Sequence, residues 1–191
     1  MPSYNIHLAI AKRYVEKNPG AIKSEQDFYD GSIAPDLDPD KKASHFSLPR
    51  TEGDLPSHIN SKVGLTSVWQ LPIGTDFEKG IFLHLLSDYV FYNHYFDKVM
   101  LKNYPPEEFT TNMYASYNFT NPWIENKYKV SYTQLSNGAL LQRYILKLQN
   151  ARPTIAQGKN LLADLSKLSG FIEFMSGFNL QKVRETQRIV S

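Results

Sequence analysis

The chain has 191 residues, of which 41% are hydrophobic and 21% charged, a balance typical of a folded protein with a sizeable core. Its 21 Lys and Arg against 19 Asp and Glu leave a net charge of +2, which argues against the basic surface of a dedicated nucleic-acid-binding protein. Cysteine is absent, so disulfides, thiolate metal ligands and thiolate nucleophiles are excluded.

Helical patterns begin at the N-terminus. Ser3 is a candidate cap for a helix ending near residue 18, and His7 lies on its apolar face, so His7 is expected to point inward. A second helix is predicted from Ser24 to about residue 33. Residues 34–42, rich in proline and aspartate, are expected to form a loop.

The remaining chain is also predicted to be helical. Residues 47–74 are expected to be irregular apart from a short helix near 65–70. Thr75 and Glu78 form a T-x-x-E capping box at the start of a long helix extending to about residue 103. Later helices are predicted over 106–117, 131–149, 153–168 and 179–190. No segment alternates like a strand, so the sequence predicts one all-α domain over residues 1–191, a helical bundle.

His84 and Asp88 are the first candidates for chemistry. Four residues apart in a helix, they share one face and can reach a single metal ion. Their neighbours are apolar, and a buried carboxylate needs a partner or a cation. An ordinary i,i+4 ion pair explains most such pairs, so this motif alone is weak.

Further imidazole and carboxylate groups accompany this pair. His7 lies on an inward face, Asp36 in the proline-bounded segment, and His45 just after it. Imidazole and carboxylate ligands without thiolate suit Zn²⁺, and also Fe or Mn. Such a centre can activate water for hydrolysis at neutral pH. The alternative is a buried network of hydrogen-bonded polar groups that holds no metal.

The order of these residues resembles the zinc-dependent phospholipase C family, which is related to the P1 nucleases. The resemblance covers about residues 1–100 and rests on an N-terminal His followed by four segments: G-S-I-A-P-D at 31–36, S-H-F at 44–46, G-x-x-x-H-L-L-x-D at 80–88, and His94. It implies an all-helical fold of the phospholipase C/P1 nuclease type, zinc ions, and hydrolysis of a phosphodiester or a phospholipid head group. Residues 106–191 are expected to form a helical C-terminal part of the same domain.

The resemblance also implies residue roles. Asp36, His45, His84 and Asp88 would form a first metal site, with Asp88 bridging to a second ion bound by His7. Asp36 would also be the catalytic residue that orients or deprotonates the attacking water. His94 would begin a third site, but six residues place it about 120° around a straight helix from Asp88. No His follows His94, so one or two ions are expected.

Other functions remain open at this point. A metal-stabilised binding protein without hydrolytic activity would use the same ligands, and a metal-free helical domain would bury them as a satisfied polar cluster. The chain contains no H-E-x-x-H, P-loop or G-x-S-x-G motif. It also lacks a signal peptide pattern and an apolar span, so a soluble cytoplasmic protein is expected, its oligomeric state undetermined.

The charge differs between the two parts of the chain. Residues 1–126 contain 11 Lys and Arg against 16 Asp and Glu, whereas residues 127–191 contain 10 against 3. The basic part could meet a phosphate-bearing small molecule or an anionic surface, although solvated helix faces explain most such patterns.

Overall fold

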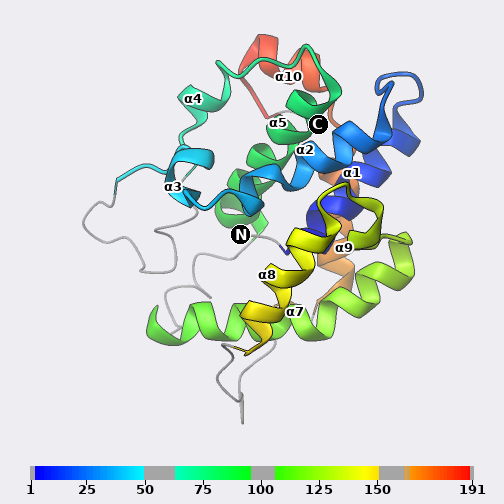
Figure 1. Cartoon of the computed structure of the whole chain (residues 1–191). Coiled ribbons are helices and arrows are strands. Elements are labelled where there is room, and N and C mark those ends of the chain that lie inside the picture. Colours follow the sequence, from blue (N-terminus) through cyan, green and yellow to red (C-terminus); the bar gives the residue numbers. More distant parts are fainter. Residues whose placement is uncertain (1–2, 50–62, 96–105, 151–161, 163, 190–191) are drawn as a thin grey trace.

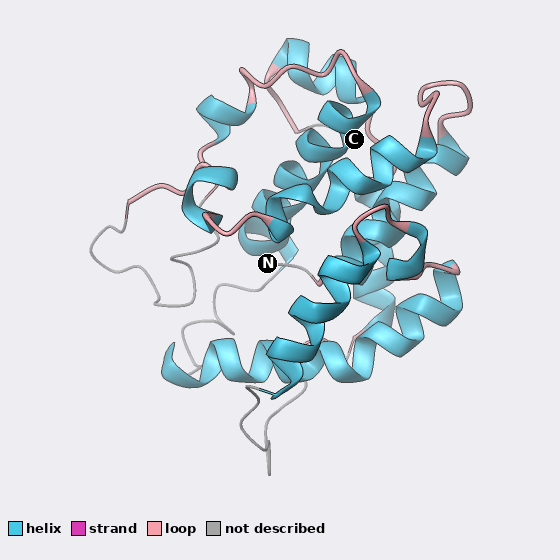
Figure 2. Ribbon diagram, viewed as in Figure 1, coloured by secondary structure: helices cyan, strands magenta, loops and turns pink. Residues whose placement is uncertain are grey.

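The computed structural model describes residues 3–49, 63–95, 106–150, 162 and 164–189, and these form helices joined by turns and loops (Figures 1 and 2). No strand occurs in this part of the chain, where the only β-type pairing is an isolated antiparallel bridge between Ser47 and Val63. The predicted all-α class is therefore confirmed for the described residues. Within the same ranges, no helix combines the length and the apolar character needed to cross a membrane.

Helix α1 spans Tyr4–Lys17, as its sequence predicts. The predicted inward face, which includes His7, is buried. Ser3 occupies the N-cap position, but its hydroxyl does not cap the helix. It donates instead to Oδ1 of Asn121 at 2.6 Å, so this residue joins α1 to a distant part of the chain.

Helix α2 spans Glu25–Leu37 and contradicts the loop predicted over residues 34–42. The helix passes through Pro35, which has no N–H to donate to the preceding turn, and it ends only after Asp36. The short helix α3, Lys41–Ser44, follows directly and is capped by the Asp40 side chain. Packing of α2 along α5 supports the helix where proline signals a break.

Helix α5, Asp76–Val90, begins with the predicted capping box, in which Thr75 accepts from the Glu78 N–H and Glu78 accepts from the Thr75 N–H. A π-helical segment, η2 at Phe91–Tyr95, continues it. The predicted continuation over residues 96–103 lies outside the described residues. The short helix α4, Leu65–Val68, falls where a short helix is predicted.

Two glycines allow α2 and α5 to approach closely. A Cβ atom on Gly31 would collide with the backbone oxygen of Phe77, and one on Gly80 would collide with the backbone oxygen of Phe28. A side chain at either position would therefore force the helices apart. This contact places the second half of α2 against the turn of α5 that carries His84.

Two C-terminal helices, α7 (Pro106–Tyr128) and α9 (Leu165–Met175), pack against α1, which also packs against α2 (Figure 1). The bounds differ from the sequence pattern: the predicted helix over 106–117 extends to residue 128, the one over 131–149 begins with a 3₁₀ turn, and the start of the one over 153–168 lies largely outside the described residues. The observed elements are α7 Pro106–Tyr128, η3 Tyr132–Gln134, α8 Gly138–Asn150, α9 Leu165–Met175 and α10 Leu180–Thr186.

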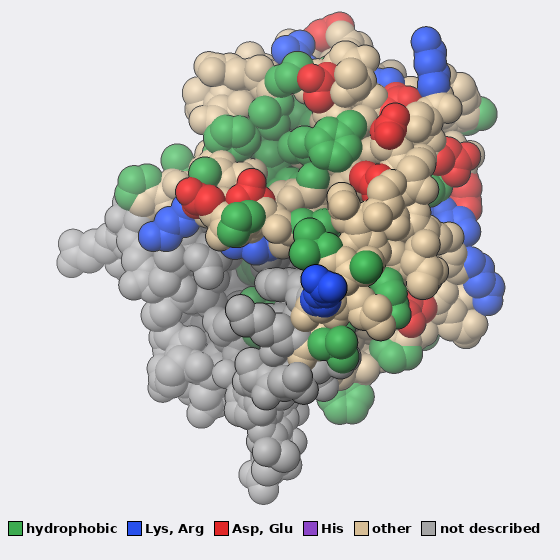
Figure 3. Space-filling model, viewed as in Figure 1, with side chains coloured by type: hydrophobic (Ala, Val, Ile, Leu, Met, Phe, Trp, Pro, Cys, Tyr) green, Lys and Arg blue, Asp and Glu red, His purple; other side chains and the backbone are tan. Residues whose placement is uncertain are grey.

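On the face drawn in Figure 3, basic, acidic and hydrophobic side chains of the described residues are interspersed. Among the described residues, the charge difference between the two parts of the sequence does not produce one continuous basic patch on this face.

Candidate metal centre

Five of the six residues predicted to bind metal come together inside the helical assembly. His7 comes from α1, Asp36 from the end of α2, His45 from the C-cap of α3, and His84 and Asp88 from α5. All five are buried, and Asp36 is the most exposed of them at 6%. Residues from four helices thus meet at one buried point.

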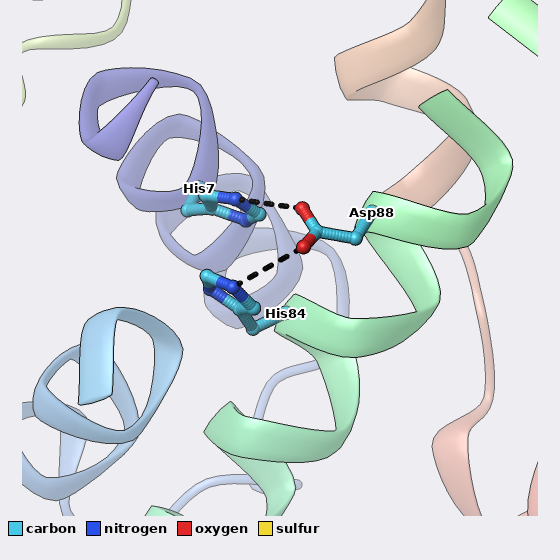
Figure 4. A group of neighbouring side chains, drawn as sticks. All are labelled: His7, His84 and Asp88. Carbon is cyan, nitrogen blue, oxygen red and sulfur yellow. Dashed lines mark ion pairs between the residues drawn. The ribbon is translucent and has the colours of Figure 1, made fainter. Parts of the chain in front are cut away.

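The Asp88 carboxylate lies between three imidazoles. Its Oδ1 is 3.3 Å from Nε2 of His7, whereas its Oδ2 is 3.4 Å from Nε2 of His45 and 3.7 Å from Nε2 of His84. Figure 4 shows the carboxylate directed with one oxygen toward His7 and the other toward His84. One oxygen of Asp88 therefore faces His7, and the other faces His45 and His84.

Two groups of possible metal ligands result. His7, His84 and Asp88 form one, and Asp36, His45 and His84 form the other, with the ligand atoms of each group within 4.8 Å of one another. Nε2 of His45 is 3.6 Å from Oδ1 of Asp36 and 3.3 Å from Nε2 of His84. His84 belongs to both groups, so they adjoin.

The backbone orients two of the imidazoles. Nδ1 of His84 lies 2.7 Å from the backbone oxygen of Ser32, and Nδ1 of His45 lies 3.0 Å from that of Lys41. A carbonyl oxygen only accepts hydrogen bonds, so both Nδ1 atoms carry the proton. With the proton on Nδ1, the Nε2 atom of each ring faces the cluster, the arrangement that metal-binding histidines adopt.

The spacing of the ligand atoms fits a divalent cation. Tetrahedral zinc with Zn–N bonds of about 2.0–2.1 Å places neighbouring ligand atoms about 3.3 Å apart. The contacts from Asp88 to His7 and His45, and from His45 to His84, are 3.3–3.4 Å. The contacts from His45 to Asp36 and from His84 to Asp88 are slightly longer, at 3.6 and 3.7 Å. Two Nε2 lone pairs facing each other at this distance repel unless a proton or a cation lies between them.

Several buried atoms of the cluster also lack hydrogen bonds. Both oxygens of Asp88 and both ring nitrogens of His7 have no hydrogen-bond partner among the described residues. Leaving a buried carboxylate unsatisfied is costly, whereas coordination to a cation satisfies its oxygens. The donor set therefore fits a metal ion better than a closed hydrogen-bond network.

Burial controls the protonation of the cluster. Burial, followed by repulsion from His7, lowers the pKa of His84 to about 3, so this imidazole is neutral and able to bind a metal at neutral pH. Burial alone would raise the pKa of the Asp36 carboxyl, but the close contact with His45 and nearby charges, including Lys41, keep it below its usual value. Asp36 is therefore ionised and available to bind a metal ion.

Lys41 marks the edge of the cluster nearest to solvent. Its ammonium group donates to the backbone oxygen of Asp36 and lies 3.4 Å from the Asp36 Oδ1. The Lys41 side chain is 27% exposed, whereas that of Asp36 is 8% exposed.

The sequence analysis did not predict the contributions of Ser32 and Lys41 to the cluster. Both residues orient a histidine through a backbone carbonyl, which every residue type carries.

His94 does not join the cluster. It lies in η2, is exposed, and has a tilted ring contact with Tyr89 at 6.0 Å. The six residues after Asp88 turn the chain away from the face that carries His84 and Asp88. Within the described residues, no further group of His, Asp or Glu that could hold a metal includes His94.

Comparison with other proteins found no match to this chain among models of protein families, curated proteins or solved structures.

Proposed function

We propose that this chain is a metal-dependent hydrolase of phosphate esters with zinc as its metal. The main support is the Asp88 carboxylate, whose two oxygens lie 3.3–3.7 Å from the Nε2 atoms of three imidazoles. The order of His7, Asp36, His45, His84 and Asp88 along the chain, which resembles that of the zinc-dependent phospholipases C, adds to this support.

The five residues would divide between one or two ions. Asp36, His45 and His84 would hold the first, and His7 the second, with Asp88 between them. A zinc ion held there supplies Lewis acidity toward a phosphoryl oxygen and lowers the pKa of a water to roughly 7. The carbonyl groups of Ser32 and Lys41 would fix the imidazoles that bind it.

Asp36 is the proposed catalytic residue. It is the most exposed carboxylate of the cluster, and its neighbour Lys41 reaches toward solvent. An ionised carboxylate at this edge can accept a hydrogen bond from the attacking water and orient it toward phosphorus. The proposed substrates are phosphodiesters, either soluble or carried by a phospholipid head group.

Metal content and hydrolysis, measured together, test this function. Protein purified without a metal-affinity tag is expected to contain one or two zinc ions per chain and to hydrolyse a chromogenic phosphodiester or phosphatidylcholine vesicles. Asp88→Asn, which keeps the side-chain shape and removes the charge, should lose metal and turnover. Asp38→Asn is the matched control, because Asp38 is exposed and lies outside the cluster. No bound metal after reconstitution with zinc would refute the proposal.

A second candidate is a metal-stabilised binding protein without hydrolytic activity. The nearly complete burial of His45, His84 and Asp88 favours it, since structural metals are enclosed by protein ligands. A binding protein of this kind should contain the same amount of zinc and lose that zinc in Asp88→Asn. It should hydrolyse neither phosphodiester. Turnover in the wild-type protein that disappears in Asp88→Asn would exclude it.

A further inference from the structure

The last carbonyl groups of α2 need hydrogen-bond donors from outside the helix. The carbonyl of Pro35 would normally accept from the N–H of residue 39, but Pro39 has none. The carbonyl of Asp36 would accept from the N–H of Asp40, which donates instead to Oδ1 of Asp38 at 2.7 Å. Two carbonyl groups at a candidate metal ligand therefore depend on donors from elsewhere in the chain.

Two side chains of α3 supply these donors. The Ser44 hydroxyl donates to the Pro35 oxygen at 3.1 Å. The Lys41 ammonium group donates to the backbone oxygen of Asp36 and lies 3.4 Å from its Oδ1. Lys41 thus contacts both the backbone and the carboxylate of Asp36.

The backbone of Lys41 contacts a second ligand of the cluster. Nδ1 of His45 lies 3.0 Å from the Lys41 backbone oxygen, and Nε2 of His45 lies 3.6 Å from Oδ1 of Asp36. Asp36 and His45 belong to one group of possible metal ligands, although Asp36 comes from α2 and His45 from the end of α3. One residue therefore joins these two ligands, Asp36 through its side chain and His45 through its backbone.

The charge of Lys41 and its contacts have opposite effects on a bound cation. An ammonium group close to a divalent cation repels it, so the charge alone would weaken metal binding. A contact that orients a ligand strengthens metal binding, and losing one typically lowers metal affinity about 10- to 100-fold. The direction in which a Lys41 variant changes metal affinity therefore separates the two effects.

We propose that Lys41 is a positioning residue of the metal centre, which fixes Asp36 relative to His45 so that both bind the same ion. This inference rests on the zinc site of the proposed hydrolase and adds a residue that is not itself a ligand. Because Asp36 is also the proposed catalytic residue, the same contact determines where the attacking water is held.

The zinc affinity of the full chain, measured by competition with a chromogenic chelator, tests this role. Lys41→Met removes the ammonium group, keeps an unbranched side chain, and should weaken the binding of one zinc ion about 10- to 100-fold. Lys41→Arg keeps a cationic donor and should recover most of the wild-type affinity. Lys42→Met is the matched control and should keep wild-type affinity, since Lys42 carries the same charge at the next position and is exposed.

Cobalt(II) in place of zinc gives a second readout that does not require turnover. Its visible absorption spectrum depends on the number and geometry of its ligands. Lys41→Met should change the spectrum of the cobalt-loaded protein, whereas Lys41→Arg and Lys42→Met should leave it as in the wild type. The metal-free variants should keep wild-type helicity by circular dichroism, because the Lys41 side chain is 27% exposed.

Four results would overturn the inference. Unchanged zinc affinity in Lys41→Met would do so and leave the hydrolase proposal standing, and so would tighter binding, which charge repulsion alone predicts. A cobalt spectrum identical to that of the wild type would show that the ligands keep their positions without Lys41. Loss of helicity in metal-free Lys41→Met would show that Lys41 supports the fold as a whole. A wild-type protein that binds no zinc would overturn the hydrolase proposal and, with it, this inference.

Discussion

Nδ1 of His84 and the backbone oxygen of Ser32 lie 2.7 Å apart, although 52 residues separate them in the sequence. This bond exists because α2 and α5 touch backbone to backbone at Gly31 and Gly80. It determines which nitrogen of His84 carries the proton and directs the other nitrogen toward His45 and Asp88. The close approach of α2 and α5 at these two glycines thus orients His84 within the candidate metal centre.

Gly80→Ala should destabilise the protein by about 3 kcal/mol or more, because the added methyl group would meet the backbone oxygen of Phe28, which cannot move aside like a side chain. Gly170→Ala is the matched control within helix α9, where a Cβ atom meets nothing within 4 Å. It should stabilise by up to about 1 kcal/mol. Urea unfolding measures both, and equal effects of the two variants would contradict the close contact.

His7 and His94 should differ in their effect on metal content. His7→Ala removes an imidazole that faces Asp88 at 3.3 Å and should lower the zinc content by up to one ion per chain. His94→Ala removes an exposed ring outside the cluster and should leave the zinc content unchanged. Elemental analysis of the two purified variants checks this, and zinc loss in His94→Ala would restore the third site that the sequence motif implies.

Removal of metal by a chelator should lower the melting temperature on the order of 10 °C. A ligand present at a thousand times its dissociation constant stabilises by about 4 kcal/mol, and each kcal/mol shifts the melting temperature of a chain of this size by about 2–4 °C. Re-addition of zinc should restore the wild-type value, whereas calcium should not, because it prefers oxygen ligands. Melting that is insensitive to the chelator would favour the metal-free helical domain.

Glu173 should make stability depend on pH. Its hydrogen bond with Arg13, followed by that with Lys17, lowers the pKa of Glu173 to about 2, whereas an unfolded glutamate titrates near 4.5. The stabilisation is therefore present above pH 4.5 and is lost as the pH falls toward 2. Because the Glu173 side chain is 38% exposed, its contribution is about 1 kcal/mol at most.

Urea unfolding of Glu173→Gln and wild type from pH 7 down to pH 3.5 measures this contribution. The variant should be less stable at pH 7, and the difference should narrow below pH 4.5, because the unfolded wild-type chain then takes up a proton at Glu173 while the folded chain does not. A difference that stays constant over this range would show that charge is not its cause. Zinc content should be unaffected, since Glu173 lies outside both ligand groups.

Local sequence patterns were sufficient for the helical class and for part of the cluster. The inward face of α1 predicted the burial of His7, and the four-residue spacing in α5 predicted that His84 and Asp88 share a face. The capping box at Thr75 located the start of α5. These features depend on helical periodicity and on hydrogen bonds within one turn, which neighbouring residues specify.

Other features could not be predicted from local patterns. Pro35 favoured a loop at Asp36, but packing against α5 keeps α2 helical to Leu37. Histidine is a suitable metal ligand, but the chain after Val90 continues as a π-helix in which His94 lies at the surface.

The sequence by itself determined that the described part of this protein is helical and that His7, His84 and Asp88 lie on inward faces. Only the tertiary structure decided which of them meet. Helical periodicity is set within one or two turns, whereas the contacts of Asp88 with His7 and His45 depend on how three separate helices pack. That packing depends on features that a sequence pattern does not show. Gly80 has no Cβ atom, which lets α2 and α5 approach, and the backbone oxygen of Ser32 then reaches His84.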